Sequence, residues 1–245
     1  MKTDKDISEV TVAVMTSCYK RKEYTAQTIK VLEEAQEYKN VYFYLVDDGS
    51  DDGTEDILRN SNLPNKHIII NKENYGFRNV TIDFFDWARE KKIDVIAKID
   101  NDVYMPKNWL NDMLKALLTT DLDVAACNHT PSNPAFTQGE DDIEGKGYRK
   151  AHKVVGLWFM DRKMTDGVFL EKSALRGIRG SEAVLLQIKF VKEPKIGWIP
   201  EVHAENIGHF SGKGIGAIKT QEYKDYHDEV GRSATWEPGE VNESK

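Results

Sequence analysis

The sequence has few cysteines, no long apolar run and no excess of positive charge. Its two cysteines, Cys18 and Cys127, have no metal-binding spacing, which favours a reducing compartment. No segment approaches the roughly 20 apolar residues that span a bilayer, and the start, MKTDKDISEV, lacks the apolar stretch of a signal peptide. The formal net charge of -7 argues against a broad basic surface for nucleic acid. We therefore expect a soluble, cytoplasmic protein.

The first half of the chain alternates short apolar runs with amphipathic helical patterns. Such alternation is typical of βαβ units, in which helices join parallel strands. We expect strands at 10–15, 41–46, 67–70, 95–99 and 124–127, and helices at 23–38, 54–58, 77–90 and 109–118. With 245 residues the chain is long enough for one large domain. The predicted fold class is α/β, a single domain with a mainly parallel central sheet.

The pattern becomes less regular in the second half. Residues 129–153 are polar and contain prolines and glycines, and a loop of this length is usually functional or mobile. A strand, a helix and a strand are expected at 154–160, 182–191 and 195–199. The predicted organisation is one domain at 8–215, with halves at 8–128 and 129–215, and a C-terminal helix and polar tail at 216–245.

Polar side chains follow three of the predicted strands. They are Thr16 and Ser17 after the first strand, Asp47 and Asp48 after the second, and Asp100 and Asp102 after the fourth. The carboxyl ends of parallel strands meet at one edge of a sheet, where ligands bind. A carboxylate there can accept hydrogen bonds from a base N–H or from ribose hydroxyls. Alternatively, Asp48, Ser50 and Asp52 cap the turn and helix of the segment DDGSDDGT.

The segment Asp100-Asn101-Asp102 is a sharper signal. Two carboxylates separated by one residue, directly after a buried strand, can both face one divalent cation. Hard oxygen ligands in low number suit Mg²⁺ or Mn²⁺ shared with a diphosphate, on which the ion would act as a Lewis acid. A D-x-D triplet also occurs by chance in solvated turns, but its position after the fourth strand favours a metal site.

Three segments carry a resemblance to a known family: VAVMTSCYKRKEYTAQTI, YLVDDGSDDGTEDIL and AKIDNDVYMPKNWLNDM. In letters, order and separation they resemble family 2 glycosyltransferases, clearly over residues 10–118 and more weakly over 154–210. The resemblance implies the GT-A fold, a Rossmann-like nucleotide-diphospho-sugar transferase domain whose 8–128 half binds the nucleotide sugar. The contacts that it implies are Thr16 near the base, Asp48 on the uracil, Asp100 and Asp102 on the metal and donor, and Arg78 on the donor.

The segment RGSEAVLLQIK places Glu182 at the start of a helical pattern, after Gly177 and Gly180. Family 2 enzymes carry a general base in such a segment, so the resemblance gives Glu182 this role. An acid at a helix N-terminus can also simply stabilise the helix dipole. Glu171 and Glu193 flank it as substitutes.

The segment HAENIGHFSGKGIG contributes two further candidates. By the resemblance, His209 follows the last core strand and reaches the metal or diphosphate; the alternative is a packed or surface histidine. Lys213 lies in a glycine-rich stretch that could close over the diphosphate. The spacing of this stretch is not that of a P-loop.

Together these residues predict a metal-dependent glycosyltransferase, inverting by the resemblance, that uses a UDP-sugar or another nucleotide-diphosphate sugar with Mn²⁺ or Mg²⁺. The acceptor stays open among a glycan, a lipid-linked glycan, a protein and a modified nucleobase, and the oligomeric state is undefined. A nucleotidyltransferase of related fold is disfavoured because the loop TSCYKRKE has no glycine. A non-catalytic nucleotide-sugar-binding module is disfavoured by Asp100, Asp102 and Glu182.

Overall fold

The structure is a computed structural model of the chain. It describes residues 5–35, 37–130, 147–151, 157–168, 170, 172, 188–189, 191–206, 210–211 and 218–219. Glu182, His209 and Lys213 lie outside the described residues.

The helices and strands of the first half follow the predicted alternation. The strands are β1 (Val12–Cys18), β2 (Val41–Asp47), β3 (Lys66–Ile70), β4 (Val95–Asp100), β5 (Val103–Tyr104), β6 (Val124–Thr130), β7 (Arg149–Lys150), β8 (Trp158–Asp161), β9 (Ile196–Asn206), β10 (Phe210–Ser211) and β11 (Ile218–Lys219). The α-helices are α1 (Lys22–Ala35), α2 (Thr54–Asn60), α3 (Phe77–Glu90) and α4 (Trp109–Thr119). Two short 3-10 helices, η1 (Ile7–Glu9) and η2 (Arg162–Thr165), complete the described elements.

Most strands form one sheet with the order β3-β2-β1-β4-β8-β6-β9-β5, and β7 pairs with β9. Strands β3, β2, β1 and β4 are mutually parallel. Strand β8 is antiparallel to both β4 and β6, and β6 is parallel to β9, so β6 and β9 run in the same direction as β4. The prediction of an α/β fold with a mainly parallel central sheet is confirmed.

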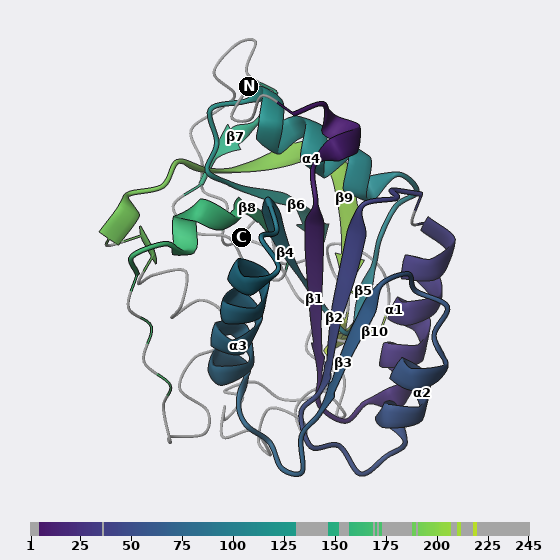
Figure 1. The fold of residues 1–245 in the computed structure, drawn as a ribbon. Coiled ribbons are helices and arrows are strands. Elements are labelled where there is room, and N and C mark those ends of the chain that lie inside the picture. The colour runs from purple at the N-terminus through teal and green to yellow at the C-terminus, as the bar shows by residue number, and fades with distance from the viewer. Residues whose placement is uncertain are drawn as a thin grey trace.

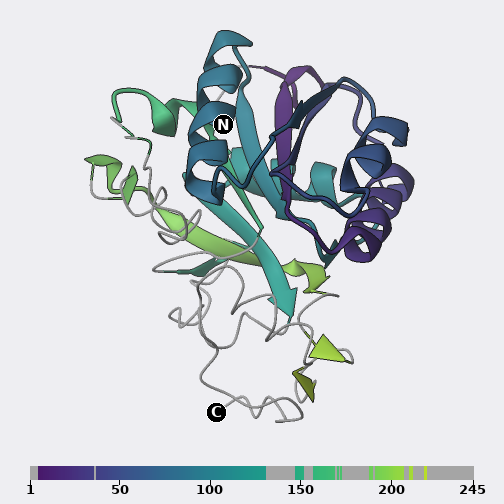
Figure 2. The ribbon, with the colours of Figure 1, turned by 90° about the horizontal axis from the view of Figure 1, so that it is seen from below.

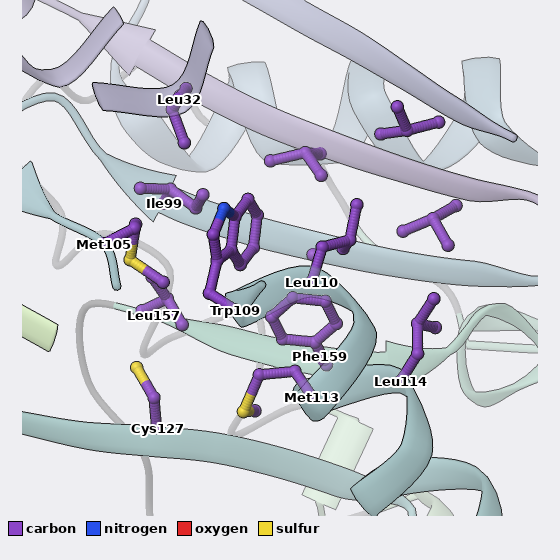
Figure 3. Close-up of a cluster of buried hydrophobic side chains, with 14 of the residues drawn as sticks. Leu32, Ile99, Met105, Trp109, Leu110, Met113, Leu114, Cys127, Leu157 and Phe159 are labelled. Carbon is purple, nitrogen blue, oxygen red and sulfur yellow. The ribbon is translucent and has the colours of Figure 1, made fainter. Parts of the chain in front are cut away.

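Helices cover both faces of the sheet (Figures 1 and 2). Apolar side chains alternate along β1: Val12 and Val14 belong to a core cluster with α1, α2 and α4, whereas Ala13 and Met15 belong to a second cluster with α3. Figure 3 shows the first cluster, in which Trp109 of α4 meets Phe159 edge to face at 5.7 Å between ring centroids. The sheet therefore has an α3 face and an α1 face, and a one-residue step along a strand changes the face.

Several predicted boundaries are wrong, and strand pairing explains the largest differences. Strand β1 continues to Cys18 because its last residues pair with β2 and β4, so Thr16 and Ser17 lie inside the strand and not after it. Strand β9 extends well beyond residue 199 because it pairs with β6 and β5. Helix α1 ends at Ala35.

Parts of the predicted second half fall outside the described residues. These are most of the loop at 129–153, the first part of the strand expected at 154–160, most of the helix at 182–191 and almost all of 216–245. Of the predicted strand, β8 is described from Trp158 onward. Among the helices that the structure describes, none is long and apolar enough to cross a membrane.

Candidate active site

The carboxyl ends of β1, β2 and β4 bring together residues that are far apart in the sequence. In the registered pairs, Cys18 lies opposite Asp47, and Ser17 lies opposite Asp100. These ends form the lower edge of the sheet in Figure 1, and Figure 2 views the molecule from that side. Asp48 follows β2 directly and is hydrogen-bonded through its backbone N–H to the Cys18 carbonyl oxygen at 2.8 Å. The predicted meeting of polar strand ends is present.

The pleat of the sheet separates the predicted residues onto two faces. Thr16 shares the face of Val14 and Cys18, toward α1, and is fully buried. Its Oγ1 has no hydrogen-bond partner among the described residues. Ser17 and Asp100 belong instead to the α3 face, by alternation from Met15 and its partner Lys98. The structure therefore does not bring Thr16 together with Asp100, and the role of Thr16 near the base stays a prediction.

Asp48 connects the end of β2 to the start of α3. Its Oδ1 accepts hydrogen bonds from Asn71 Nδ2 and from the Tyr75 backbone N–H, both at 2.8 Å, and its Oδ2 accepts one from the Gly76 N–H at 3.0 Å. The side chain is buried, and three donors surround the two oxygens. Asp48 thus positions the segment that leads into α3 and carries Arg78 in the first helical turn.

Two other acids of the segment DDGSDDGT, Asp47 and Asp52, close its turn. Asp47 Oδ1 accepts from the Ser50 N–H at 2.9 Å, and Asp52 Oδ1 accepts from the Thr54 N–H and hydroxyl at 3.1 and 2.7 Å. Burial raises the pKa of Asp47 despite the hydrogen bond from Ser50. Burial acts in the same direction on Asp52, but its hydrogen bonds from Thr54 and Lys22 outweigh burial and lower its pKa. Of the three residues in the capping alternative, Asp52 caps the start of α2, whereas Asp48 bonds to the next loop and the Ser50 hydroxyl accepts from the Lys20 N–H at 2.8 Å.

Gly49 lets the two loops at this edge approach closely. Its φ of +86° is in the left-handed region, and a Cβ there would lie 2.4 Å from the backbone carbon of Glu73. Both the conformation and the contact require glycine. Residues 49 and 73 are thereby packed backbone to backbone beside Asp48.

Asp100 is paired with a lysine that precedes it by two residues on the same face of β4. The Lys98 ammonium donates to Asp100 Oδ1, and the two side chains are 4% and 31% exposed. The same ammonium lies 4.9 Å from the centroid of the Phe77 ring, at the first residue of α3. Lys98 is a buried cation, and buried lysines are rare unless they are paired.

Asp102 is paired with the loop that follows β1. Arg21 Nη1 lies 3.0 Å from Asp102 Oδ2, and the side chains are only 7% and 4% exposed. The Arg21 guanidinium also lies 4.3 Å from the centroid of the Tyr24 ring. Lys20 and Arg21 have φ of 56° and 62°, a left-handed conformation that costs non-glycine residues on the order of 1–3 kcal/mol when it is strained. The loop is thus held in an unusual conformation that places Arg21 on the D-x-D acid.

Two threonines of helix α1 are hydrogen-bonded to the D-x-D turn. Asn101 Nδ2 donates to the Thr25 hydroxyl at 3.0 Å, and the Val103 N–H donates to the Thr28 hydroxyl at 3.1 Å. Both threonines are buried on α1. The turn between Asp100 and Val103 is therefore anchored on both sides of Asp102.

The D-x-D acids can be tested as ligands of the predicted Mn²⁺ or Mg²⁺. Both offer hard carboxylate oxygens at one strand end, but each is held by a protein cation. Only Asp100 is exposed enough to meet an ion as it stands. Among the residues that the structure describes, no group of three or more His, Cys, Asp or Glu side chains is arranged to hold a metal. Asp100 fits the role of one ligand, and Asp102 fits it once Arg21 is displaced.

Sequence reasoning overlooked Lys98 and Arg21. A signal for each was present: Lys98 interrupts the apolar strand VIAKI, and Arg21 lies in the basic run YKRK between β1 and α1. Both are close to acids that the sequence did single out. The pairing of Lys98 with Asp100 follows from strand alternation, because residues two apart on a strand share a face. The pairing of Arg21 with Asp102 depends on the path of a loop, which the sequence pattern does not specify.

The fold is that of the GT-A glycosyltransferases. The crystal structure of S. aureus TarS 1–349 superposes with a TM-score of 0.60 at 15% identity, over 80% of this chain and 60% of that chain. The structure of GalNAc-T7 with UDP, GalNAc and Mn²⁺ superposes with a TM-score of 0.61 at 14% identity, over 80% of this chain and 44% of that chain. This chain therefore spans less than two thirds of the length of either protein.

The family is shown by the sequence itself. The profile of glycosyl transferase family 2 matches residues 13–178, which is more than half of the chain. The chain belongs to this family. No curated protein matches the sequence.

Proposed function

We propose that this protein is a metal-dependent, inverting glycosyltransferase that transfers a sugar from a UDP-sugar, or another nucleotide-diphosphate sugar, to an acceptor. The observation that carries the proposal is the meeting of Ser17, Asp48 and Asp100 at one edge of the sheet, beside the start of α3. This edge is formed by the carboxyl ends of the strands, beyond which open α/β sheets bind ligands. The presence of UDP and Mn²⁺ in the GalNAc-T7 structure supports the choice of donor and metal.

In this proposal the two loops around Gly49 bind the nucleotide. Asp48 and Arg78 contact the donor on the α3 side, and Ser17 and Asp47 lie at the strand ends beneath it. Thr16 and Lys213 are further donor contacts, on the strength of the family resemblance. When bound at Asp100, a divalent ion would stabilise negative charge on the leaving diphosphate.

Glu182 is the proposed general base. It removes the proton of the acceptor hydroxyl as the acceptor oxygen forms a bond to the anomeric carbon. The bond from that carbon to the diphosphate oxygen breaks on the opposite face, and its electron pair leaves with UDP. This single displacement inverts the anomeric configuration. Asp102 and His209 are the remaining proposed metal ligands.

The donor site is tested by calorimetry with UDP. Wild-type protein should bind UDP at least tenfold more tightly with Mn²⁺ than with EDTA, because the ion joins the diphosphate to Asp100. Asp100→Asn should remove most of this difference, since the amide is a weaker ligand than a carboxylate. Asp121→Asn, at the opposite edge of the sheet, is the control and should behave as wild type. Tight UDP binding that ignores both metal and Asp100→Asn would contradict the metal site.

The products separate the proposal from its alternatives. Incubated with UDP-sugars and Mn²⁺, a glycosyltransferase releases UDP, slowly without acceptor. A nucleotidyltransferase of related fold would instead form or consume pyrophosphate. A binding module would release neither product.

Glu182→Gln tests the mechanism. A general base contributes typically 10²–10⁴-fold to rate and little to binding of the other substrate. Transfer should therefore fall by about two orders of magnitude or more, while UDP affinity stays within a few-fold. Glu193→Gln is the matched control and should transfer nearly normally. Wild-type transfer by Glu182→Gln would show that another group is the base.

A further inference from the structure

The buried lysine beside the D-x-D triplet has no place in the mechanism above. Lys98 is the fourth residue of β4, and its neighbours in register are Met15 of β1 and Trp158 of β8. All three lie on the α3 face, in or beside the apolar cluster that packs under that helix. An apolar residue would serve packing there without the cost of burying a charge. Packing alone therefore does not explain a lysine at this position.

The ammonium group of Lys98 is directed toward Asp100 at the candidate donor site. Its ammonium donates to Asp100 Oδ1 and lies over the Phe77 ring, and the side chain is 4% exposed. Asp100, by contrast, is 31% exposed. In this ion pair the ammonium of Lys98 is buried, whereas the carboxylate of Asp100 is partly exposed at the candidate site.

We infer that Lys98 is a resident counter-cation of Asp100 that competes with a divalent ion for the same carboxylate and so sets the affinity of the metal. The inference rests on the proposed function, in which Asp100 is a metal ligand. Lys98 acts through Asp100 and is a positioning residue.

The electrostatic argument fixes the direction of the effect. In the absence of an ion, the ammonium neutralises Asp100 and holds Oδ1. An ion that binds Asp100 must share or replace this contact. The ion is also repelled by the positive charge of Lys98, which water and salt screen only weakly because Lys98 is buried. Removing the charge while keeping the apolar stem should therefore make metal binding tighter. A lysine with a purely structural role would give unchanged or weaker binding when it is replaced.

Mn²⁺ binding without donor, followed by electron paramagnetic resonance titration, tests the inference. Lys98→Met keeps an unbranched side chain against Met15 and Trp158, and it should bind Mn²⁺ roughly threefold to tenfold more tightly than wild type. Lys98→Arg retains the charge and should stay within about twofold of wild type. Lys195→Met breaks a lysine–aspartate pair at the other edge of the sheet and should change nothing. Unchanged or weaker Mn²⁺ binding by Lys98→Met would overturn the inference.

A thermodynamic cycle of unfolding guards against misfolding of a single variant. If Lys98 acts through Asp100, the destabilisation of the double variant Lys98→Met/Asp100→Asn should be smaller than the sum of the two single changes. Additive effects would overturn the inference without any metal measurement. Failure of the proposed function gives a different result, because wild-type protein would then show no Mn²⁺-dependent binding of UDP.

Discussion

At the scale of single residues, the described aspartates of the candidate site, Asp48, Asp100 and Asp102, are already engaged. Asp48 is held by three donors, Asp100 by Lys98 and Asp102 by Arg21. These partners neutralise or satisfy groups that would otherwise be buried at a cost. Donor binding must therefore exchange contacts at this site.

Asp48→Asn tests whether Asp48 positions the start of α3. Asp48 now accepts hydrogen bonds from the N–H groups of Tyr75 and Gly76 through its two oxygens. An amide has only one acceptor oxygen, so its NH₂ group would face one of these N–H donors and leave it without a hydrogen bond. We expect a loss of about 1–3 kcal/mol in the free energy of unfolding, measured with urea, together with weaker UDP binding. Asp51→Asn, an exposed acid of the same loop, is the control. A stability equal to wild type would mean that the three hydrogen bonds contribute little.

At the scale of elements, the periodicity of the sequence was enough for the first half of the fold. Apolar runs predicted β2, β3 and β4, and amphipathic patterns predicted α3 and α4, nearly to the residue. Each of these elements is determined largely by its own residues, because these form a mainly apolar strand or a helix with one apolar face. Elements whose ends depend on a neighbour were predicted less well: β1 and β9 continue as far as their pairing partners allow.

In the candidate site, too, the features that depend on local sequence were predicted better than those that depend on neighbouring elements. Asp48 and Asp100 were predicted at the sheet edge because they follow apolar strands directly, and the structure places them there. The sequence pattern did not specify on which face of the sheet each of these residues lies. In the structure the pleat of β1 directs Thr16 toward α1. Lys98 shares a face with Asp100 by strand alternation, which the sequence does indicate. Arg21 reaches Asp102 through a loop with positive φ, which no local pattern encodes.

At the scale of the whole molecule, the two edges of the sheet have different chemistry. The carboxyl edge carries the candidate site with its buried ion pairs. The opposite edge has a cavity of about 520 Å³ lined by Lys5, Asp94, Arg162 and apolar residues of β4 and α4. There Asp94 joins the chain before β1 to the start of β4, since it accepts from Lys5 Nζ at 2.7 Å and from the Thr11 N–H and hydroxyl at 2.8 Å. Asp94 thereby holds two segments of the chain together at the edge of the sheet that lies away from the candidate site.

The pH dependence of stability tests that role of Asp94. Burial alone would raise the pKa of Asp94, but the hydrogen bonds from Lys5 and Thr11 outweigh burial and lower it. A carboxyl group whose pKa is lower in the folded state contributes stability above its unfolded pKa, and this contribution is lost as pH falls through the folded value. Asp94→Asn should therefore cost about 1–3 kcal/mol near neutral pH, and its difference from wild type should shrink below about pH 4. Urea unfolding of Asp94→Asn and wild type, near neutral pH and below about pH 4, measures the loss of stability and its decrease with pH.

The control is Asp86→Asn, which removes an exposed pair with Arg89 and should have a small effect at either pH. A difference between Asp94→Asn and wild type that is the same at both pH values would show that the charge of Asp94 contributes nothing.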